Sequence, residues 1–461
     1  MSKILFVYPN KEGYPIIPLG ISVLAGILKY HGHEVDVFDI TFMMAERIDH
    51  KAREKTGVVK EIRVEKYWGT GDKVDIKEEF KRKILSYKPD LIAFSIVENN
   101  YGCAKELFKI AKETANIPII AGGIFPTVAL KFFIEDENVD IICMGEGESA
   151  LLELANRIGE NKDFSDIPNL VVKKDGNAIK NNFAKYYDWT PLIFQDWDIF
   201  DQRHILKPFM GKIWRTGFFE MSRGCPYNCS YCANHIYQEI FKSLGKYRRE
   251  KPVEYLIKEV EYMKEKYDLE LVFFNDENFL VMSDERFEEF CRKYKERVNL
   301  PFFIQTRAET LIDEKKVQEL KETRCITIGI GVESGSEKIR KEVLNKMTSD
   351  DIFISAFANC NKYEIRTTAY IMMGLPFETE QDILSSAEFC KKIKAKSIAI
   401  SIFAPYHATK LWQVCLDNGF IENKYYDDIS VNNSSILNMP QLPKEKIEEL
   451  YYKFNDLVYG K

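Results

Sequence analysis

Three cysteines, Cys225, Cys229 and Cys232, lie close together in the sequence, with three and two residues between them. Thiolates at this spacing can surround one compact metal centre, and such soft ligands select an iron–sulfur cluster, zinc or copper(I). Structural zinc sites use four protein ligands, and the only nearby candidate for a fourth is His235. Three ligands would instead leave one iron of a four-iron cluster open. The spacing therefore favours an iron–sulfur cluster, with a structural zinc site as the alternative.

The cysteines directly follow an apolar segment, Gly217 to Met221, that we expect to form a strand. Short apolar runs then alternate with amphipathic segments, which is typical of repeated strand–helix units and a parallel sheet. The other expected strands are Leu271 to Asn275, Phe302 to Gln305, Ile326 to Gly331, Thr367 to Met373 and Ile398 to Phe403. Six such units predict a partial (β/α)6 TIM-like barrel over residues 213–405. Active sites assemble at the carboxyl ends of barrel strands, which is where the cysteines fall.

Polar or glycine residues follow several of these expected strands. They are Asp276, Glu277, Arg307, Glu333, Ser334 and Gly374. Each also suits a plain structural role, because Asp favours turns and caps and an arginine can form an external salt bridge. Their shared position at strand ends favours a common ligand site.

The first 150 residues show the same alternation and predict an N-terminal Rossmann-like (flavodoxin-like) doubly wound parallel sheet. The expected strands are Ile4 to Tyr8, Glu34 to Ile40, Leu91 to Val97, Pro118 to Gly122 and Val139 to Met144. The carboxyl ends of the last three strands and the loops that follow them carry Ser95, Ile96, Val97, Glu98, Gly122, Gly123, Ile124, Pro126, Thr127, Gly145, Glu146 and Gly147. Glycines there let backbone approach a large flat ligand, and helix starts can hold phosphate. The alternative is a domain that only positions the barrel.

The remaining segments are expected to connect or cover these two domains. Residues 151–212 are predicted to be a linker with an aromatic strap, and residues 406–461 a small, mainly helical C-terminal segment. The charged residues 43–80 are expected to form an exposed insertion in the first domain. None of these segments carries a recognisable catalytic motif.

The cysteine spacing, with aromatic Tyr231 before the third cysteine, resembles the signature of the radical S-adenosylmethionine superfamily. The resemblance implies an oxygen-sensitive 4Fe–4S cluster whose open iron binds S-adenosylmethionine. Reductive cleavage of that molecule, with an electron from an external flavodoxin- or ferredoxin-type reductant, would give a radical that abstracts hydrogen from a substrate. The residues that would contact S-adenosylmethionine are Tyr231, Asp276, Glu277, Arg307, Glu333, Ser334 and Gly374.

Together the two domains resemble the cobalamin-binding radical S-adenosylmethionine enzymes, which include the class B-type radical methylases. The resemblance rests on Pro18-Leu19-Gly20 and on the Gly-Gly-x-x-Pro-Thr and Gly-Glu-Gly-Glu loops, and it covers residues 1–410. It implies that cobalamin binds at the residues Ser95 to Glu98, Gly122 to Ile124, Pro126, Thr127 and Gly145 to Gly147. The Asp-x-His-x-x-Gly motif of cobalamin mutases is missing, so no axial imidazole is predicted.

The resemblance implies an enzyme that transfers a methyl group from methylcobalamin to an unactivated carbon, or to phosphorus, of a small-molecule, natural-product or lipid substrate. A radical cyclase or rearrangement enzyme and a methylthiotransferase are the enzymatic alternatives. A methylthiotransferase would need three more cluster cysteines in the first domain, which offers only Cys103 and Cys143. A zinc-stabilised binding protein is the alternative without catalysis.

The composition limits the partners. A formal net charge of −6 gives no broad positive field, so a nucleic-acid substrate is not expected. The first apolar run, Ile4 to Tyr8, is too short for a signal peptide or a spanning helix, which predicts a cytoplasmic protein. The seven scattered cysteines are expected to be buried packing residues, because a reducing compartment keeps thiols free.

Overall fold

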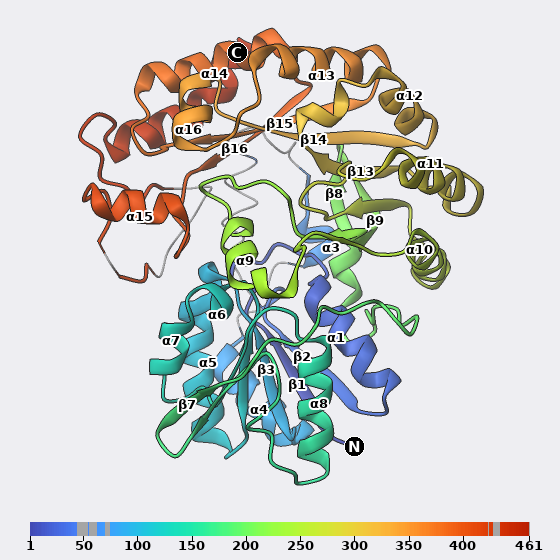
Figure 1. Ribbon diagram of the computed structural model, residues 1–461, viewed down its shortest axis with the longest axis vertical. Helices are drawn as coiled ribbons and strands as arrows, with labels where there is room; N and C mark the ends of the chain where they lie inside the picture. Colours follow the sequence, from blue (N-terminus) through green and yellow to red (C-terminus); the bar gives the residue numbers. More distant parts are fainter. Residues whose placement is uncertain (44–53, 55–61, 70–73, 423, 427–433, 461) are drawn as a thin grey trace. The chain divides into compact units, whose positions relative to one another are not determined.

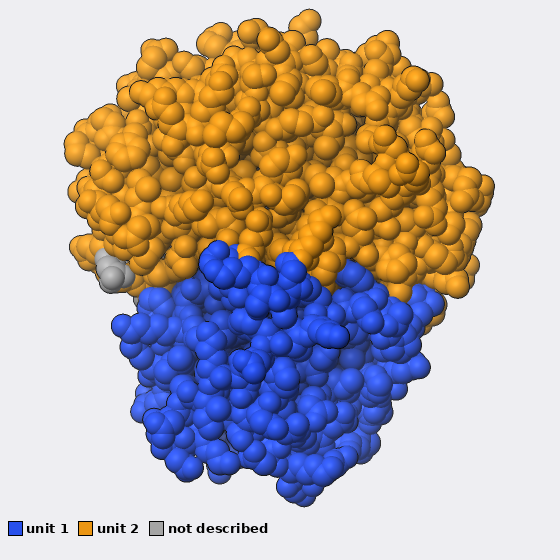
Figure 2. Space-filling model, in the orientation of Figure 1, with its two compact units in different colours: residues 1–48, 63–206, 239–245 blue, residues 49–62, 207–238, 246–461 orange. Residues whose placement is uncertain are grey.

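The computed structural model describes residues 1–43, 54, 62–69, 74–422, 424–426 and 434–460. The chain divides into two compact units, which Figure 2 distinguishes by colour. The first unit comprises Met1–Ile48, Arg63–Leu206 and Glu239–Gly245, and the second comprises Asp49–Ile62, Lys207–Gln238 and Lys246–Lys461. Much of the predicted insertion at 43–80 lies outside the described residues.

The first unit is built on a seven-stranded sheet with the order β2-β1-β3-β4-β5-β6-β7. Its parallel strands are β1 (Lys3–Tyr8), β2 (Glu34–Asp39), β3 (Leu91–Ser95), β4 (Ile119–Gly122) and β5 (Ile141–Cys143). This order is that of a flavodoxin-like doubly wound sheet, so the prediction for this domain is confirmed. Strands β1, β3, β4 and β5 are mostly buried apolar runs, as strands covered on both faces require. The edge strand β2 is only partly buried.

Helices cover both faces of this sheet (Figure 1). They include α1 (Leu19–Tyr30), α4 (Ile76–Tyr87), α5 (Tyr101–Thr114), α7 (Leu130–Glu135) and α8 (Glu148–Gly159). The described part of the unit also contains the short helices α3 (Glu65–Trp68) and α6 (Ile124–Val128). Helix α1 ends because Gly32 takes the left-handed φ of +85°. Right-handed crossovers place α1 and α8 together on one face and α4 and α5 on the other.

The predicted linker belongs to the first unit instead of forming a separate segment. The hairpin β6 (Leu170–Lys174) and β7 (Asn177–Lys180) extends the sheet, because β6 pairs antiparallel with β5. The chain then runs along the unit as far as Leu206, where the second unit begins. The pairing of β5 with β6 joins distant parts of the sequence, which local patterning cannot reveal.

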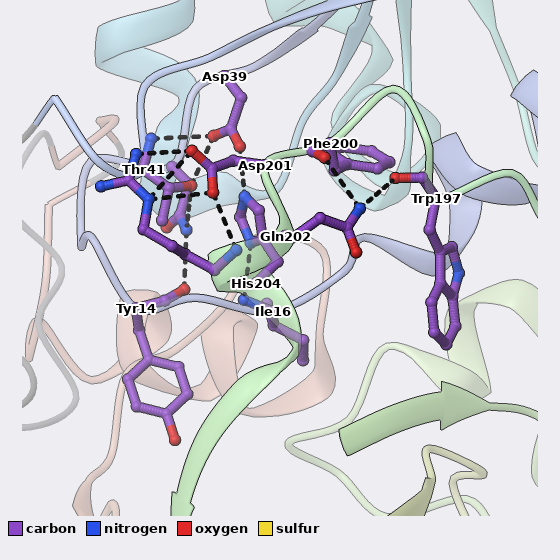
Figure 3. A network of polar contacts seen from close by, with 11 residues as sticks. Tyr14, Ile16, Asp39, Thr41, Trp197, Phe200, Asp201, Gln202 and His204 are labelled. Atoms are coloured by element: carbon purple, nitrogen blue, oxygen red, sulfur yellow. Dashed lines mark hydrogen bonds and ion pairs between the residues drawn. The ribbon is translucent and has the colours of Figure 1, made fainter. Parts of the chain in front are cut away.

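A buried polar network fixes the end of this strap to the sheet (Figure 3). His204 is fully buried in the short 3-10 turn Gln202–Ile205, and its Nδ1 accepts from the amide of Ile16 at 3.2 Å. Its Nε2 therefore carries the proton and donates to the carboxylate of Asp39, the last residue of β2. The same carboxylate accepts from the amide and hydroxyl of Thr41 at 2.9 and 2.6 Å. The network ties the strap to the carboxyl edge of the sheet.

The second unit contains a curled sheet of order β16-β15-β14-β13-β12-β9-β8. Its strands are β8 (Leu206–Phe209), β9 (Lys212–Phe219), β12 (Leu271–Phe274), β13 (Phe302–Thr306), β14 (Cys325–Glu333), β15 (Arg366–Met373) and β16 (Ser397–Ile402). The six from β9 to β16 are parallel, which confirms the predicted partial barrel. Strand β8 adds a seventh at one edge, joined to β9 through Met210 and Gly211.

Helices form the outer layer around these strands (Figure 1). They include α10 (Val253–Tyr267), α11 (Asp284–Lys293), α12 (Glu314–Glu322), α13 (Asp350–Lys362), α14 (Glu380–Ile393) and α16 (Lys444–Tyr459). Two further helices, α9 (Asn234–Ile240) and α15 (Lys410–Asp417), follow the cysteine loop and the last strand. The C-terminal helix α16 packs on α14 and β16, so this segment completes the barrel unit. Within the described residues, no helix is long and apolar enough to cross a membrane.

Candidate active site

The three cysteines lie in the loop that follows β9, at the carboxyl edge of the barrel. The loop begins after β10 (Ser222–Arg223), which pairs antiparallel with β11 (Arg249–Glu250). Gly224 turns the chain with φ +83°, and a Cβ there would lie 2.8 Å from the ring of Tyr247. Only glycine fits this position, which directs the chain into the loop.

Side chains and backbone groups from the rest of the unit fix this loop. Gln238 donates from Nε2 to the carbonyl of Cys225 at 2.8 Å, and Asn345 donates from Nδ2 to the carbonyl of Asn228 at 2.8 Å. The amide of Ser230 donates to the carbonyl of Leu344 at 3.0 Å. These bonds orient the loop without using the cysteine sulfur atoms.

His235 is occupied by backbone groups on both ring nitrogens. Its Nε2 accepts from the amide of Lys410 at 3.3 Å, so its Nδ1 carries the proton and donates to the carbonyl of Cys229 at 3.2 Å. The imidazole is therefore committed to loop structure and is not offered as a fourth metal ligand. This arrangement disfavours the zinc alternative.

Two N–H groups face the cysteine sulfur atoms. Asn234 donates from Nδ2 to Sγ of Cys232 at 3.4 Å, and Arg307 donates from Nη1 to Sγ of Cys229 at 3.6 Å. Burial raises the pKa of the Cys225 thiol to about 11, so this thiol is protonated at neutral pH when it binds no metal. In the described part of the chain, no three His, Cys, Asp or Glu side chains are placed so that they could hold a single metal ion. Three soft donors with N–H groups directed at sulfur fit an iron–sulfur cluster.

The two acidic residues after β12 have different surroundings. Asp276 is buried and accepts from the amide of Met221 at 3.0 Å and from the hydroxyl of Ser222 at 2.5 Å. Burial raises its pKa to about 6. Asp276 therefore holds the strand end that leads into the cysteine loop, and its carboxylate is already engaged by the protein.

Glu277, the second residue of this pair, is more exposed than Asp276, although backbone amides of Gly224 and of Glu277 itself hydrogen-bond its carboxylate. Its side chain is exposed, yet it lies close enough to Cys225 and Cys232 to raise the pKa of both thiols. Lost hydration, followed by the charges of Asp276 and Glu220, raises the pKa of Glu277 itself to about 7. Of these two predicted S-adenosylmethionine contacts, Asp276 is buried and Glu277 is exposed.

Tyr231, Glu333 and Lys346 form a buried group beside the cysteine loop. The hydroxyl of Tyr231 donates to Oε1 of Glu333 at 3.1 Å, and Nζ of Lys346 donates to the same oxygen at 3.1 Å. Glu333 has the left-handed φ of +71°, at a register shift where β14 meets β15. A Cβ at Gly331 would lie 3.0 Å from Nζ of Lys346, so glycine leaves room for this pair. The sequence predicted Tyr231 and Glu333 and missed Lys346.

The predicted residues Ser334 and Gly374 are engaged inside the protein. Ser334 is fully buried, and its hydroxyl accepts from the amide of Ser336 at 3.2 Å. The amides of Gly374 and Leu375 donate to Oε2 of the buried Glu378 at 2.6 and 3.1 Å. Any contact of this turn with an adenine base would therefore use groups other than these two amides.

In the first unit, the predicted glycines have the special backbone that their loops require. Gly123 has φ +107°, and a Cβ there would lie 2.7 Å from the carbonyl oxygen of Ile96. Thr127 joins two of these loops, because its hydroxyl donates to the carbonyl of Gly123 at 2.9 Å and accepts from the amide of Gly145 at 3.0 Å. The loops after β3, β4 and β5 thus form one connected edge.

This edge also exposes apolar side chains. Val97 is 45% exposed and Ile124 is 49% exposed, although both adjoin buried strands. At Gly145 the close approach is made by a side chain, because a Cβ there would lie 2.5 Å from the ring of Phe241. Glu146 is held through its Oε2, which accepts from the amide of Tyr187 at 3.0 Å. Exposed apolar residues beside glycine-rich backbone suit a large flat ligand. This edge is therefore consistent with cobalamin binding, which stays a prediction.

Models of two protein families match the chain. The Radical SAM superfamily matches residues 219–390, and the B12 binding domain matches residues 63–155. These ranges lie mainly in the second and first units, respectively.

Similar proteins are found among known sequences and among solved structures. An uncharacterized methyltransferase of Pyrococcus horikoshii is 24% identical, covering 91% of this chain and 84% of the relative. The anaerobic magnesium-protoporphyrin IX monomethyl ester cyclase of Rubrivivax gelatinosus is 23% identical, covering 89% and 69%, respectively. A radical S-adenosylmethionine methyltransferase from Kitasatospora setae, solved with cobalamin and a 4Fe–4S cluster, superposes with a TM-score of 0.68 at 18% identity, covering 99% of this chain and 85% of that one. The solved structure confirms the fold over the whole chain.

Proposed function

Because this chain is a radical S-adenosylmethionine enzyme that carries a B12 binding domain, we propose that it transfers a methyl group from methylcobalamin to an unactivated carbon, or to phosphorus, of a small-molecule substrate. The observation that carries the proposal is the presence of both domains in one chain. When bound, the cluster supplies the electron that cleaves S-adenosylmethionine, and cobalamin supplies the transferable methyl group.

The residues of the barrel support the cluster's part of this proposal. Cys225, Cys229 and Cys232 would ligate three irons, and the loop that carries them is held by bonds that leave the sulfur atoms available. Glu277 would accept from the amino group of S-adenosylmethionine, because its carboxylate lies beside the cysteines. These side chains bind and orient, and no proton transfer by the protein is required for the cleavage.

The glycine-rich edge of the first unit supports the cobalamin part. The exposed Val97 and Ile124 would contact the corrin, and the loops at Ser95 and Gly123 would border its benzimidazole tail. None of the residues predicted for this site is a histidine, so an open or non-coordinated lower cobalt face is part of the proposal.

The proposal is tested without knowledge of the substrate. Anaerobically reconstituted protein is incubated with cob(I)alamin and S-adenosylmethionine labelled with ¹³C in the methyl group, and the corrinoid is analysed by mass spectrometry. Labelled methylcobalamin, together with 5′-deoxyadenosine in the presence of a strong reductant, is expected. Deoxyadenosine without methylation of cobalamin would contradict the methyltransferase.

A radical cyclase is the second candidate, and the similarity to the magnesium-protoporphyrin ester cyclase favours it. The labelling experiment separates the two, because a cyclase has no need to methylate cobalamin. A methylthiotransferase is less well supported, since Cys143 is buried in β5 and Cys103 lies apart from it in α5. A cytoplasmic location and a flavodoxin- or ferredoxin-type reductant complete the proposal.

A further inference from the structure

Arg307 contacts a cysteine that is predicted to hold the cluster. It follows β13, and its Nη1 donates to Sγ of Cys229 at 3.6 Å. Its guanidinium carbon lies 3.9 Å from the ring centre of Tyr227, between Cys225 and Cys229 in the loop. Arg307 therefore touches the cysteine loop both through a sulfur atom and through an aromatic face.

Glu309 and Thr348 hold the guanidinium in this position. Nε and Nη2 of Arg307 donate to the two carboxylate oxygens of Glu309 at 3.2 and 2.6 Å, and Nη2 also donates to the hydroxyl of Thr348 at 3.0 Å. The hydroxyl of Thr348 in turn donates to Oε1 of Glu309 at 2.5 Å. Because the planar guanidinium is held by both Glu309 and Thr348, its orientation is fixed, and Nη1 points at Sγ of Cys229.

The sequence predicts that Arg307 contacts S-adenosylmethionine, and the natural target of a guanidinium in that molecule is the carboxylate. The arrangement of Arg307 argues against a bidentate contact of this kind. A bidentate carboxylate contact needs two parallel N–H groups of the fork. Four of the five N–H groups of Arg307 already have partners among the described residues: Glu309 twice, Thr348 and Cys229. The remaining group could form only a single bond.

A cation that donates to a cluster sulfur stabilises the reduced state more than the oxidised state. One electron from the external reductant takes the cluster from the 2+ to the 1+ state, which adds one negative charge to the iron, sulfide and thiolate atoms. Hydrogen bonds to sulfur and nearby charge are among the factors that set the potential of such clusters. The side chain of Arg307 is only 11% exposed, so water screens this interaction little.

We propose that Arg307 is a positioning residue that raises the reduction potential of the cluster through Cys229, and that Glu309 and Thr348 fix it there. The proposal deepens the proposed function and rests on ligation of the cluster by the three cysteines. It does not depend on cobalamin or on methyl transfer.

The test is an anaerobic potentiometric titration of the reconstituted cluster, followed by electron paramagnetic resonance without S-adenosylmethionine. Arg307→Met is expected to bind the same amount of iron as the unsubstituted protein and to have a lower midpoint potential. Thr348→Val, which keeps the cation but loosens it, is expected to shift the potential less and in the same direction. Arg215→Met is the matched control, because Arg215 donates to the carbonyl of Tyr267 at the other end of the barrel strands.

Binding of S-adenosylmethionine, measured by equilibrium dialysis, separates the two roles. Unchanged affinity with a lowered potential in Arg307→Met supports the proposal. An unchanged potential with at least tenfold weaker binding would assign Arg307 to the cofactor carboxylate and overturn it. If Arg307→Met does not retain iron, Thr348→Val decides, and an unchanged potential in that variant overturns the proposal. Failure of methyl transfer would leave these measurements intact, whereas an unsubstituted protein without any iron–sulfur cluster would overturn this proposal directly.

Discussion

The hydroxyl of Tyr231 donates a hydrogen bond to the carboxylate of Glu333 at 3.1 Å, across 102 residues of sequence. Tyr231 immediately precedes the third cysteine of the loop, and Glu333 is the last residue of β14. The bond therefore connects the cysteine loop with a strand end on the other side of β12 and β13 in the sheet. Because Lys346 donates to the same carboxylate oxygen, the position of the loop depends on a buried ion pair.

Loss of Lys346 is expected to destabilise the barrel unit strongly. Lys346 is 2% exposed and Glu333 is 9% exposed, so Lys346→Met would leave a buried carboxylate without its cation. Breaking such a pair costs about 3 kcal/mol or more, whereas replacing both charges costs much less. Urea unfolding of the cluster-free protein should therefore show a lower midpoint for Lys346→Met than for Glu333→Gln/Lys346→Met.

Lys341→Met is the control for this comparison, because Lys341 pairs with Glu337 on the surface and is 47% exposed. Its free energy of unfolding is expected to change by no more than roughly 0.5 kcal/mol, as for an ordinary surface substitution. The urea midpoint should therefore stay close to that of the unsubstituted protein. Equal midpoints for Lys341→Met and Lys346→Met would show that the buried pair contributes nothing to stability.

The sequence predicted Tyr231 and Glu333 because each lies next to a recognisable feature: a cysteine motif in one case and a strand end in the other. Lys346 has no such neighbour. It belongs to a loop after the π-helical turn Ile339–Val343, and its burial depends on where that loop returns to the sheet. Its neighbours Leu344 and Thr348 are nearly fully buried in the structure. Their burial cannot be read from the sequence, so the sequence does not indicate that Lys346 is buried too.

The fold was more predictable than the contacts within it. The parallel strands of both units coincide with apolar runs in the sequence. The length of such a run and the glycines beside it can be read from the sequence directly, so these strands were predictable. The addition of the hairpin β6–β7 to the sheet beside β5 was not predicted. Strand pairing of this kind is determined by tertiary packing, as is the choice between Asp276 and Glu277 at the end of β12.

Gly123→Ala is expected to destabilise the first unit and to abolish retention of a corrinoid. The residue has φ +107°, and the new Cβ would lie 2.7 Å from a backbone oxygen of Ile96, which cannot move as a side chain can. Backbone strain alone costs about 1–3 kcal/mol, and the clash adds to it. Thermal unfolding and the visible absorbance of protein expressed with cobalamin measure the two effects.

Gly176→Ala is the matched control for Gly123→Ala. Gly176 has a left-handed φ of +77° in the β6–β7 turn, and nothing lies within 4 Å of a Cβ added there. Gly176→Ala should lower the unfolding temperature through backbone strain alone, without a steric clash. It should retain the corrinoid fully. Loss of corrinoid from Gly176→Ala as well would indicate general instability of the unit instead of a local effect at the predicted site.

Replacing any one of the three cysteines of the loop by alanine is expected to remove most of the iron and sulfide from anaerobically reconstituted protein. A cluster with three protein ligands cannot lose one and keep its open iron in place. Cys291→Ala is the control, because Cys291 is buried in α11 and makes a packing contribution. One equivalent of zinc in the unsubstituted protein, with no iron–sulfur absorbance, would revive the zinc alternative.

Glu378 is expected to make the stability of the barrel unit depend on pH. The residue is fully buried, and burial raises its pKa from the usual 4.5 to about 8 despite the hydrogen bonds from Leu375 and Gly374. The folded protein therefore holds this proton more tightly than the unfolded chain does. Stability contributed by the protonated group is complete below pH 4.5 and is lost as the pH rises to about 8.

Glu378→Gln is expected to remove this dependence. A glutamine amide oxygen can accept from the amides of Gly374 and Leu375 as the carboxyl oxygen does, but it carries no charge at any pH. As the pH rises from 5 to 9, the free energy of unfolding of the variant should increase by roughly 2 to 5 kcal/mol relative to that of the unsubstituted protein. Urea unfolding at each pH measures this difference. Glu380→Gln, at an exposed position at the start of α14, should leave the pH profile unchanged. A parallel profile for Glu378→Gln and the unsubstituted protein would mean that Glu378 does not titrate in this range.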